Sequence, residues 1–149
     1  MKEIIEPQIK ELEQLVYKPM VIHQVSDSTE ILRIENDPNF TRIDFIHYAT
    51  PIYINGGWVQ LYSKTFIRPV GSNLCLTLVN AINIPIAPKK HYYKSTKDFL
   101  CYTLVFPALP PGTQSIDIIE KEIPGDNTWF NFYGVSMDKV RSERLIVGN

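Results

Sequence analysis

Several features from which function is commonly inferred are scarce or missing in this sequence. Cysteine occurs only twice, at Cys75 and Cys101. Two cysteines are too few to form a disulfide scaffold. The two residues fall in separate predicted strands, so a disulfide between them stays open, and we favour a free, buried pair. No run of 18 apolar residues occurs, which excludes a membrane-spanning helix.

A secretory signal is also missing from the N-terminal segment. The sequence MKEIIEPQIKELEQ mixes charged residues with isoleucine and leucine and has no continuous apolar stretch. This composition predicts a cytoplasmic protein. A leader or preceding domain in a longer gene product would instead place the chain outside the cytoplasm.

An excess of one charge is missing as well. Fifteen basic residues stand against sixteen acidic ones, for a net charge of −1. Nucleic-acid-binding domains usually carry a clear basic excess, so the overall balance argues against nucleic acid as a partner. A local basic patch stays open.

Catalytic and metal-binding motifs are absent. The sequence contains no GxSxG, HExxH, CxxC, P-loop or GxGxxG pattern. His23, His47 and His91 are far apart and lack the spacing of metal ligands. The carboxylates of Asp117 and Glu120 are expected to be solvated at a strand edge. We therefore predict a non-catalytic protein with no metal and no cofactor.

The residues that are present favour one globular β domain. A length of 149 residues and a hydrophobic fraction of 44% suit a single domain with a real core. Eleven prolines, eight tyrosines and seven phenylalanines favour strands and rigid turns. We divide the chain into an N-terminal helix (residues 1–18), a β-sandwich (20–135) and a C-terminal tail (138–149).

The helix is predicted from spacing. Proline after Glu6 suits the first turn of a helix, and Pro19 would end it. Apolar residues recur at helical intervals between these points, at Ile5, Ile9, Leu12 and Val16.

Short strands and turns follow. Alternating or apolar runs predict strands near 20–25, 30–34, 41–48, 65–69, 74–79 and 129–135. Asn36-Asp37-Pro38-Asn39 predicts a turn, and Asn55-Gly56-Gly57 predicts a tight connection with positive φ inside a hairpin of residues 52–62. Residues 80–88 carry two prolines, which predicts an edge segment.

The most informative stretch is FLCYTLVFPALPPGTQSIDIIE, residues 99–120. Leu100, Tyr102, Leu104 and Phe106 share one face of a strand, and the other face is also largely apolar. This pattern is typical of a strand inside a two-layer structure. The prolines that follow force a corner before a second strand begins near Ile116.

One cluster has the composition of a ligand-binding surface. It combines aromatic and basic residues, namely Tyr53, Trp58, Lys90, His91, Tyr92 and Tyr93. Sugar rings or bases stack on such aromatic side chains, and lysines meet phosphates. The alternative is a solvated lysine loop whose tyrosines fold back on the body of the domain, which we favour for the segment 89–97.

The motif TLVFPALPPGTQSIDIIE, followed by WFNFYGV, resembles a β-sandwich domain of Bacteroidetes proteins. In that group a strand of the form TL.FP.LP..T..ID.IE precedes an aromatic segment that ends in glycine. The match covers Tyr102–Val135, and GGWVQLY and TFIRP within 53–69 fit an earlier strand pair more loosely. The resemblance implies an immunoglobulin-like fold of poorly defined function, often found beside modules such as thioredoxin-like domains. It brings no catalytic residue.

Together these observations predict a mainly β protein, an immunoglobulin-like β-sandwich of about seven to nine strands with one short N-terminal helix. The predicted function is a non-catalytic binding, interaction or accessory module. Its expected partner is another protein or domain, bound through the aromatic cluster or an exposed strand edge. Two alternatives stay open: a carbohydrate- or nucleic-acid-binding domain that uses loop 89–97, and an enzyme that pairs Cys75 or Cys101 with a histidine.

Overall fold

The computed structural model describes residues 14–126 and 128–138. These residues form β-strands and no helix. The strands are β1 (Gln14–Tyr17), β2 (Val21–Gln24), β3 (Thr29–Asn36), β4 (Phe40–Tyr48), β5 (Trp58–Val59), β6 (Phe66–Pro69), β7 (Leu76–Thr77), β8 (Asn80–Ile82), β9 (His91–Tyr92), β10 (Phe99–Pro107), β11 (Ser115–Ile119) and β12 (Phe132–Ser136). The mainly β prediction is therefore confirmed.

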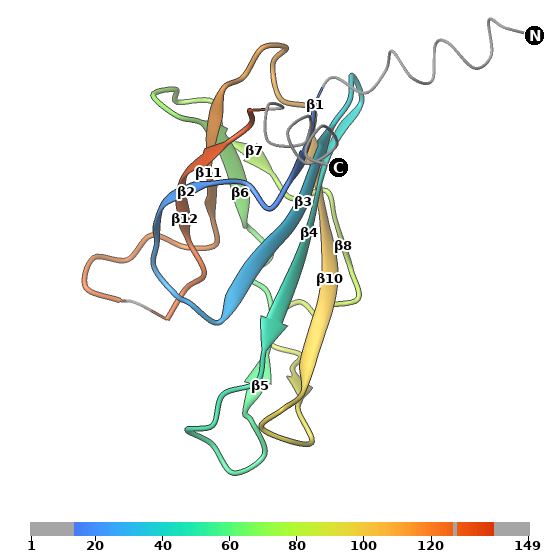
Figure 1. The fold of residues 1–149 in the computed structure, drawn as a ribbon, viewed down its shortest axis with the longest axis vertical. Helices are drawn as coiled ribbons and strands as arrows, with labels where there is room; N and C mark the ends of the chain where they lie inside the picture. The colour runs from blue at the N-terminus through green and yellow to red at the C-terminus, as the bar shows by residue number, and fades with distance from the viewer. Residues whose placement is uncertain (1–13, 127, 139–149) are drawn as a thin grey trace, which may run out of the picture.

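Two antiparallel sheets of five strands make up most of the molecule (Figure 1). The first sheet has the order β1-β3-β4-β10-β8, and the second has the order β2-β12-β11-β6-β7. The longest pairing joins β4 to β10 over nine residues, from Tyr48 opposite Phe99 to Phe40 opposite Pro107. The short strand β8 lies at an edge of the first sheet, as predicted for the segment 80–88 from the two prolines that follow the strand.

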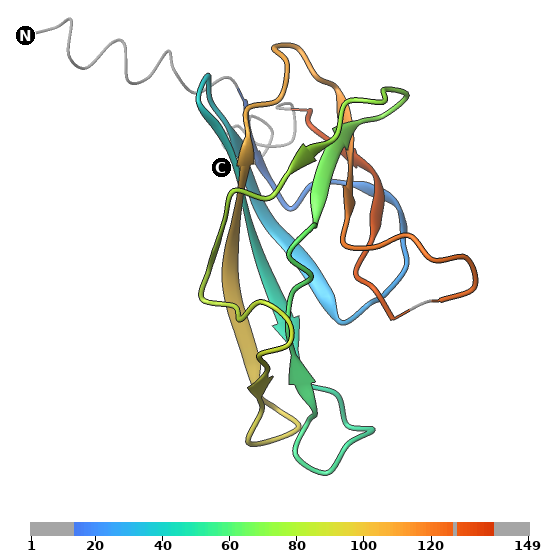
Figure 2. The ribbon, with the colours of Figure 1, turned by 180° about the vertical axis from the view of Figure 1, so that it is seen from behind.

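The hydrophobic core lies between these two sheets. Phe45 of β4 shows the packing: its ring centroid lies 6.1 Å from that of Phe132, which belongs to the second sheet. Ile43 and Leu104 from the first sheet and Ile118 from the second are fully buried in the same cluster. Figure 2, the view from behind, shows the sheets as two layers that diverge toward the lower end of the molecule.

Strand β10 has the predicted inward face. Tyr102, Leu104 and Phe106 are buried, and Leu100 is half-buried. The opposite face differs from the prediction, because Phe99 is 55% exposed and Cys101 is exposed as well. Within residues 14–126 and 128–138 no further sheet or helix covers that face, and Phe99 and Cys101 are exposed there.

The predicted corner after β10 is held by polar side chains. The amide of Leu109 donates to Asn36 Oδ1 at 3.1 Å and to Thr41 Oγ1 at 3.2 Å. Both acceptors are fully buried. A proline-rich segment cannot satisfy all its backbone groups by strand pairing, so buried side chains supply the partners.

The N-terminal helix is wrong where the structure can test it. Residues 1–13 lie outside the described part, but Gln14–Tyr17 form strand β1, paired antiparallel with Arg33–Asn36 of β3. The Gln14 side chain donates to the carbonyl oxygens of Thr113 at 2.6 Å and Met137 at 3.2 Å. Pairing with the open edge of β3 thus outweighs the helical spacing that ended at Val16. The predicted tail, residues 138–149, lies outside the described part except for Asp138.

The hairpin predicted for residues 52–62 is also wrong. Trp58 and Val59 pair with Tyr92 and His91, which come from a distant part of the chain. Residues 50–57 instead form a closed loop, in which the Thr50 amide donates to the Gly56 carbonyl at 3.0 Å. Positive φ is confirmed, at +89° for Gly56 and +82° for Gly57. The small sheet β5-β9 brings together two segments that carry most of the predicted ligand-binding residues.

Candidate functional site

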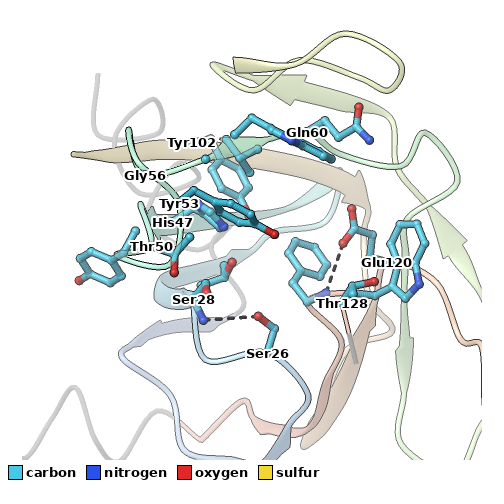
Figure 3. A pocket seen from close by; sticks show the side chains of 17 residues that line it. Ser26, Ser28, His47, Thr50, Tyr53, Gly56, Gln60, Tyr102, Glu120 and Thr128 are labelled. Carbon is cyan, nitrogen blue, oxygen red and sulfur yellow. Dashed lines mark hydrogen bonds between the residues drawn. The ribbon is translucent and has the colours of Figure 1, made fainter. Parts of the chain in front are cut away.

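A pocket of about 420 Å³ lies between the ends of the two sheets (Figure 3). We call it the aromatic pocket. Segments that are distant in the sequence contribute to it: the turn before β3, the end of β4 with the loop to β5, strand β10, and the chain from Glu120 to Phe130. Its lining residues are Ser26, Ser28, Thr29, His47, Tyr48, Thr50, Tyr53, Gly56, Gly57, Trp58, Val59, Gln60, Tyr102, Glu120, Thr128, Trp129 and Phe130.

Aromatic rings form much of this lining, and several of them pack against residues of the hydrophobic core. The Phe45 ring stacks on Tyr102 at 5.1 Å and on Phe130 at 5.5 Å between centroids. Trp129 is fixed by its indole N–H, which donates to Asp126 Oδ2 at 3.0 Å. Contacts within the protein therefore hold these three rings in place.

The chain has two tryptophans, and both line the aromatic pocket. Trp58 is 46% exposed, and its ring carries the Lys90 ammonium 4.3 Å from the centroid. Trp129 is half-buried, and Lys121 Nζ lies 5.4 Å from its centroid. Each lysine stabilises the ring it covers through a cation–π contact.

Glu120 brings a buried carboxylate to the pocket wall. Only 8% of the residue is exposed. The amide of Tyr62 donates to Oε2 at 3.1 Å, and the amide of Phe130 donates to Oε1 at 3.2 Å. Burial raises the pKa of Glu120 above its ordinary value, and these two amide donors oppose the rise.

Burial of Glu120 corrects the expectation that this residue is solvated. Asp117 is likewise 8% exposed and not a solvated edge charge. Its Oδ2 accepts a hydrogen bond from Arg68 Nε at 3.0 Å, and its Oδ1 accepts one from the amide of Gly134 at 3.0 Å. Both carboxylates accept hydrogen bonds from donors on neighbouring segments: backbone amides for Glu120, and a guanidinium and an amide for Asp117. The alternation of β11 does not reveal these donors.

Asn131 completes the support of the segment that follows Glu120. Its Oδ1 accepts hydrogen bonds from the amides of Glu120 at 2.7 Å and Lys121 at 3.1 Å. Its Nδ2 donates to the Lys121 carbonyl at 2.7 Å. Glu120 and Asn131 together fix the loop that carries Thr128 and Trp129 into the pocket. Figure 3 shows Glu120 and Thr128 across the pocket from Thr50.

His47, at the end of β4, is linked to Tyr93. Nδ1 of His47 lies 2.8 Å from the Tyr93 hydroxyl, which donates to the His47 carbonyl oxygen at 3.2 Å. The two rings are parallel within 3°. Burial lowers the pKa of His47 to about 4 and raises that of Tyr93 well above its ordinary value. At neutral pH both side chains are uncharged.

The structure brings the six predicted ligand-binding residues to one end of the molecule, in two environments. Tyr53 and Trp58 line the aromatic pocket. The other four lie on or beside β9 and outside the pocket lining: Lys90, His91, Tyr92 and Tyr93.

Loop 89–97 is partly folded back, as the favoured interpretation expected. Tyr93 is 3% exposed, and the His91 ring meets its edge at a centroid distance of 5.3 Å. Tyr92 remains 64% exposed. With Tyr93 buried, Tyr92 is the one tyrosine of this loop that offers an open face for stacking.

Sequence reasoning missed most of the pocket lining. It assigned no site role to Glu120, Trp129 or His47. One signal was available: a glutamate at the end of an apolar strand, followed after a turn by Trp-Phe-Asn, has to be either solvated or bonded by backbone amides. The sequence does not show which segment faces which across the two sheets.

The two cysteines are free, and both are exposed, which contradicts the predicted burial. Cys101 lies opposite Ile46 in the β4–β10 pairing, whereas His47 lies opposite Leu100. Because neighbouring residues of a strand point to opposite faces, Cys101 and His47 lie on different faces of the first sheet. That pair does not form a thiol–imidazole site.

Within residues 14–126 and 128–138, no cluster of three or more His, Cys, Asp and Glu side chains could hold a metal ion. The same residues contain no helix long and apolar enough to cross a membrane. Comparisons with protein-family models, curated proteins and solved structures find no match to this chain.

Proposed function

We propose that this chain is a non-catalytic binding module with an immunoglobulin-like β-sandwich fold, and that its aromatic pocket holds a small hydroxylated ligand such as a sugar. The observation that carries the proposal is the composition of the pocket lining. The lining combines flat aromatic rings with a few side chains that can form hydrogen bonds. This combination is typical of small-molecule sites.

The aromatic rings match the apolar faces of a sugar. Tyr53 and Trp58 line the pocket and keep much of their surface exposed, at 62% and 46%. Their rings offer large apolar area at low cost in side-chain entropy.

The polar side chains match sugar hydroxyl groups. Ser28, Thr50 and Thr128 are hydroxyl-bearing residues of the lining, and a hydroxyl can donate and accept. The Thr128 hydroxyl donates to Asp126 Oδ1 at 2.7 Å, so it offers a ligand its acceptor lone pairs. Glu120 adds an acceptor. Its oxygens each take one backbone amide, and a carboxylate oxygen can accept more than one hydrogen bond.

The resemblance of Tyr102–Val135 to Bacteroidetes β-sandwich domains supports the accessory class. The polar residues of that motif have structural partners in this chain. Thr113 Oγ1 donates to the Pro110 carbonyl at 2.6 Å, and Asp117 and Glu120 bond backbone amides. These polar residues of the motif make hydrogen bonds within the fold. This structural role is what we expect of a module that binds and does not catalyse.

Intrinsic fluorescence tests the proposal directly, because both tryptophans line the pocket. The full chain is titrated with glucose, galactose, mannose, N-acetylglucosamine, maltose and cellobiose. At least one sugar is expected to change the emission in a saturable way. Tyr53→Ala should weaken that binding by roughly tenfold with the melting temperature unchanged, since Tyr53 is largely exposed.

Tyr92→Ala serves as the matched control. Tyr92 is exposed to the same extent, at 64%, and lies outside the pocket lining. Sugar binding should be unchanged in this variant. Equal losses in Tyr53→Ala and Tyr92→Ala would move the site to the outer surface, and no saturable change with any of the six sugars would refute the proposed ligand class.

A further inference from the structure

The end of the molecule beyond the two large sheets is a built projection, which we call the tip (residues 49–58 and 89–99). Its two loops pack on each other through backbone groups. The Ala49 amide donates to the Asp98 carbonyl at 3.0 Å, and the Tyr93 amide donates to the Gly57 carbonyl at 3.0 Å. Figures 1 and 2 both show these loops side by side at the lower end, opposite β1.

The most exposed large hydrophobic residues of the tip are aliphatic. Ile52 is 83% exposed and Ile54 is 95% exposed, and Tyr53 stands between them. Isoleucine side chains that stay in water contribute little to the stability of the fold, because stabilisation comes from burying apolar surface. Contiguous exposed apolar residues of this kind mark a surface that meets another apolar phase or partner.

The tip also carries four lysines. Lys94 and Lys97 lie in the neighbouring loop, and Lys89 and Lys90 follow at its base; all four are exposed. The tip contains one acidic residue, Asp98, whose carboxylate accepts from the amides of Lys94 at 3.4 Å and Phe99 at 2.9 Å. Four lysines against one aspartate leave three net positive charges on the tip of a chain whose net charge is −1.

We propose that the tip docks on the surface of an anionic lipid membrane. Ile52 and Ile54 would enter the boundary between head groups and acyl chains. The amphipathic rings of Tyr53, Trp58 and Tyr92 suit the head-group level, where tyrosine and tryptophan are enriched. Lysines beside such a segment are attracted to phosphatidylserine and similar lipids. This inference shares Tyr53 and Trp58 with the sugar-binding proposal but depends on Ile52, Ile54 and the lysines, which lie outside the pocket lining.

A lipid surface fits better than a protein partner for reasons of shape and charge. The tip projects from the body and presents its apolar residues outward, whereas protein partners more often meet a flat or hollow patch with a polar rim. Aliphatic side chains on a projecting loop can enter a bilayer without a matching pocket. In an anionic membrane the lipid head groups around them carry negative charge.

Sedimentation with vesicles tests the inference. The full chain is mixed with vesicles of phosphatidylcholine alone, or of phosphatidylcholine with phosphatidylserine. We expect binding to the anionic vesicles at least about tenfold tighter than to the neutral ones, weakened by added salt. Ile52→Asp combined with Ile54→Asp should abolish binding to both. Lys94→Glu combined with Lys97→Glu should remove the preference for phosphatidylserine.

Ile22→Asp is the matched control, because Ile22 is 86% exposed on β2, outside the tip. Its vesicle binding should equal that of the unmodified chain. A Trp129→Phe variant leaves Trp58 as the sole tryptophan, and its emission should shift to the blue with anionic vesicles. Absence of vesicle binding, or equal loss in Ile22→Asp, would overturn the inference. So would retained binding in the Ile52/Ile54 variant with an unchanged melting temperature.

Discussion

The carboxylate of Glu120 accepts a hydrogen bond from the backbone amide of Phe130 at 3.2 Å, across the loop that follows β11. The contact ties the end of a core strand to the segment that leads into β12. It also places a titratable group in the wall of the aromatic pocket. One residue thus serves the fold and shapes the site, and substitutions at Glu120 separate the two contributions.

Replacement of Glu120 by alanine should lower the free energy of unfolding by about 2–4 kcal/mol, because the amides of Tyr62 and Phe130 lose their acceptor. Glu120→Gln keeps one acceptor oxygen but turns its NH2 group toward the other backbone amide, so its loss should be smaller than that of alanine, about 1–2 kcal/mol. Urea denaturation of both variants measures the difference. Equal losses would mean that the position requires both carboxylate oxygens as acceptors, and that the shape of the side chain is not enough.

Glu120 also predicts a dependence of stability on pH. Its pKa in the folded state lies above the ordinary 4.5, because burial disfavours the charge. The folded state therefore holds the proton more tightly, and the stability from this group is full below 4.5 and is lost as the pH rises through the folded-state pKa. Glu120→Gln should lack this decline. A difference between the two proteins that stays constant across this range would contradict the raised pKa.

His47 should show the opposite behaviour. Burial lowers its pKa from 6.5 to about 4, so between these values the unfolded chain binds a proton that the folded chain does not. The stability contributed by neutral His47 is full above 6.5 and is lost as the pH falls toward 4. Nuclear magnetic resonance titration of the ring should give a midpoint near 4, and His47→Gln should flatten the stability profile. A midpoint near 6.5 would show that water reaches the ring freely.

Much of the fold was predictable from residues whose pattern is local. The alternation of Leu100, Tyr102, Leu104 and Phe106 identified the inward face of β10, and Asn55-Gly56-Gly57 identified positive φ. The hairpin and the described end of the predicted helix, Gln14–Tyr17, were wrong for one shared reason. Both segments pair with a distant part of the chain, β1 with β3 and β5 with β9, and such pairing overrides local spacing.

The site was less predictable, because its residues come together only through the packing of two sheets. Aromatic and basic composition was enough to select Tyr53 and Trp58, which line the pocket. It also selected Tyr93, which is buried against His47 and unavailable to a ligand. Glu120 was interpreted as solvated, because nothing in the sequence places the amides of Tyr62 and Phe130 beside it.

The exposure of the two cysteines can be tested directly. Both are free and exposed, so a disulfide-exchange reagent should label two thiols per chain in the native protein. The yield should not increase in urea, and Cys75→Ser should halve it. Labelling that requires urea would restore the burial expected from the sequence, and labelling far faster than a free peptide thiol would revive the thiol-enzyme alternative.

The tip depends on Gly56, which has a φ of +89°. A Cβ at this position would lie 2.6 Å from the Ser95 carbonyl oxygen and 2.6 Å from Ala49 Cβ. Neither atom is the far end of a flexible side chain, so the two loops of the tip would have to separate. Gly56→Ala should therefore destabilise the protein by more than the roughly 1–3 kcal/mol expected for a strained φ alone.

Gly112→Ala isolates the steric part of that effect. Gly112 has a similar φ of +80°, but no atom lies within 4 Å of the added Cβ. The two variants share the backbone strain and differ in the clash, so the difference between their free energies of unfolding measures how tightly loops 50–57 and 93–98 are packed. If Gly56→Ala costs no more than Gly112→Ala, the two loops are able to move apart, and the tip is not the single rigid projection that the hydrogen bonds of Ala49 and Tyr93 indicate.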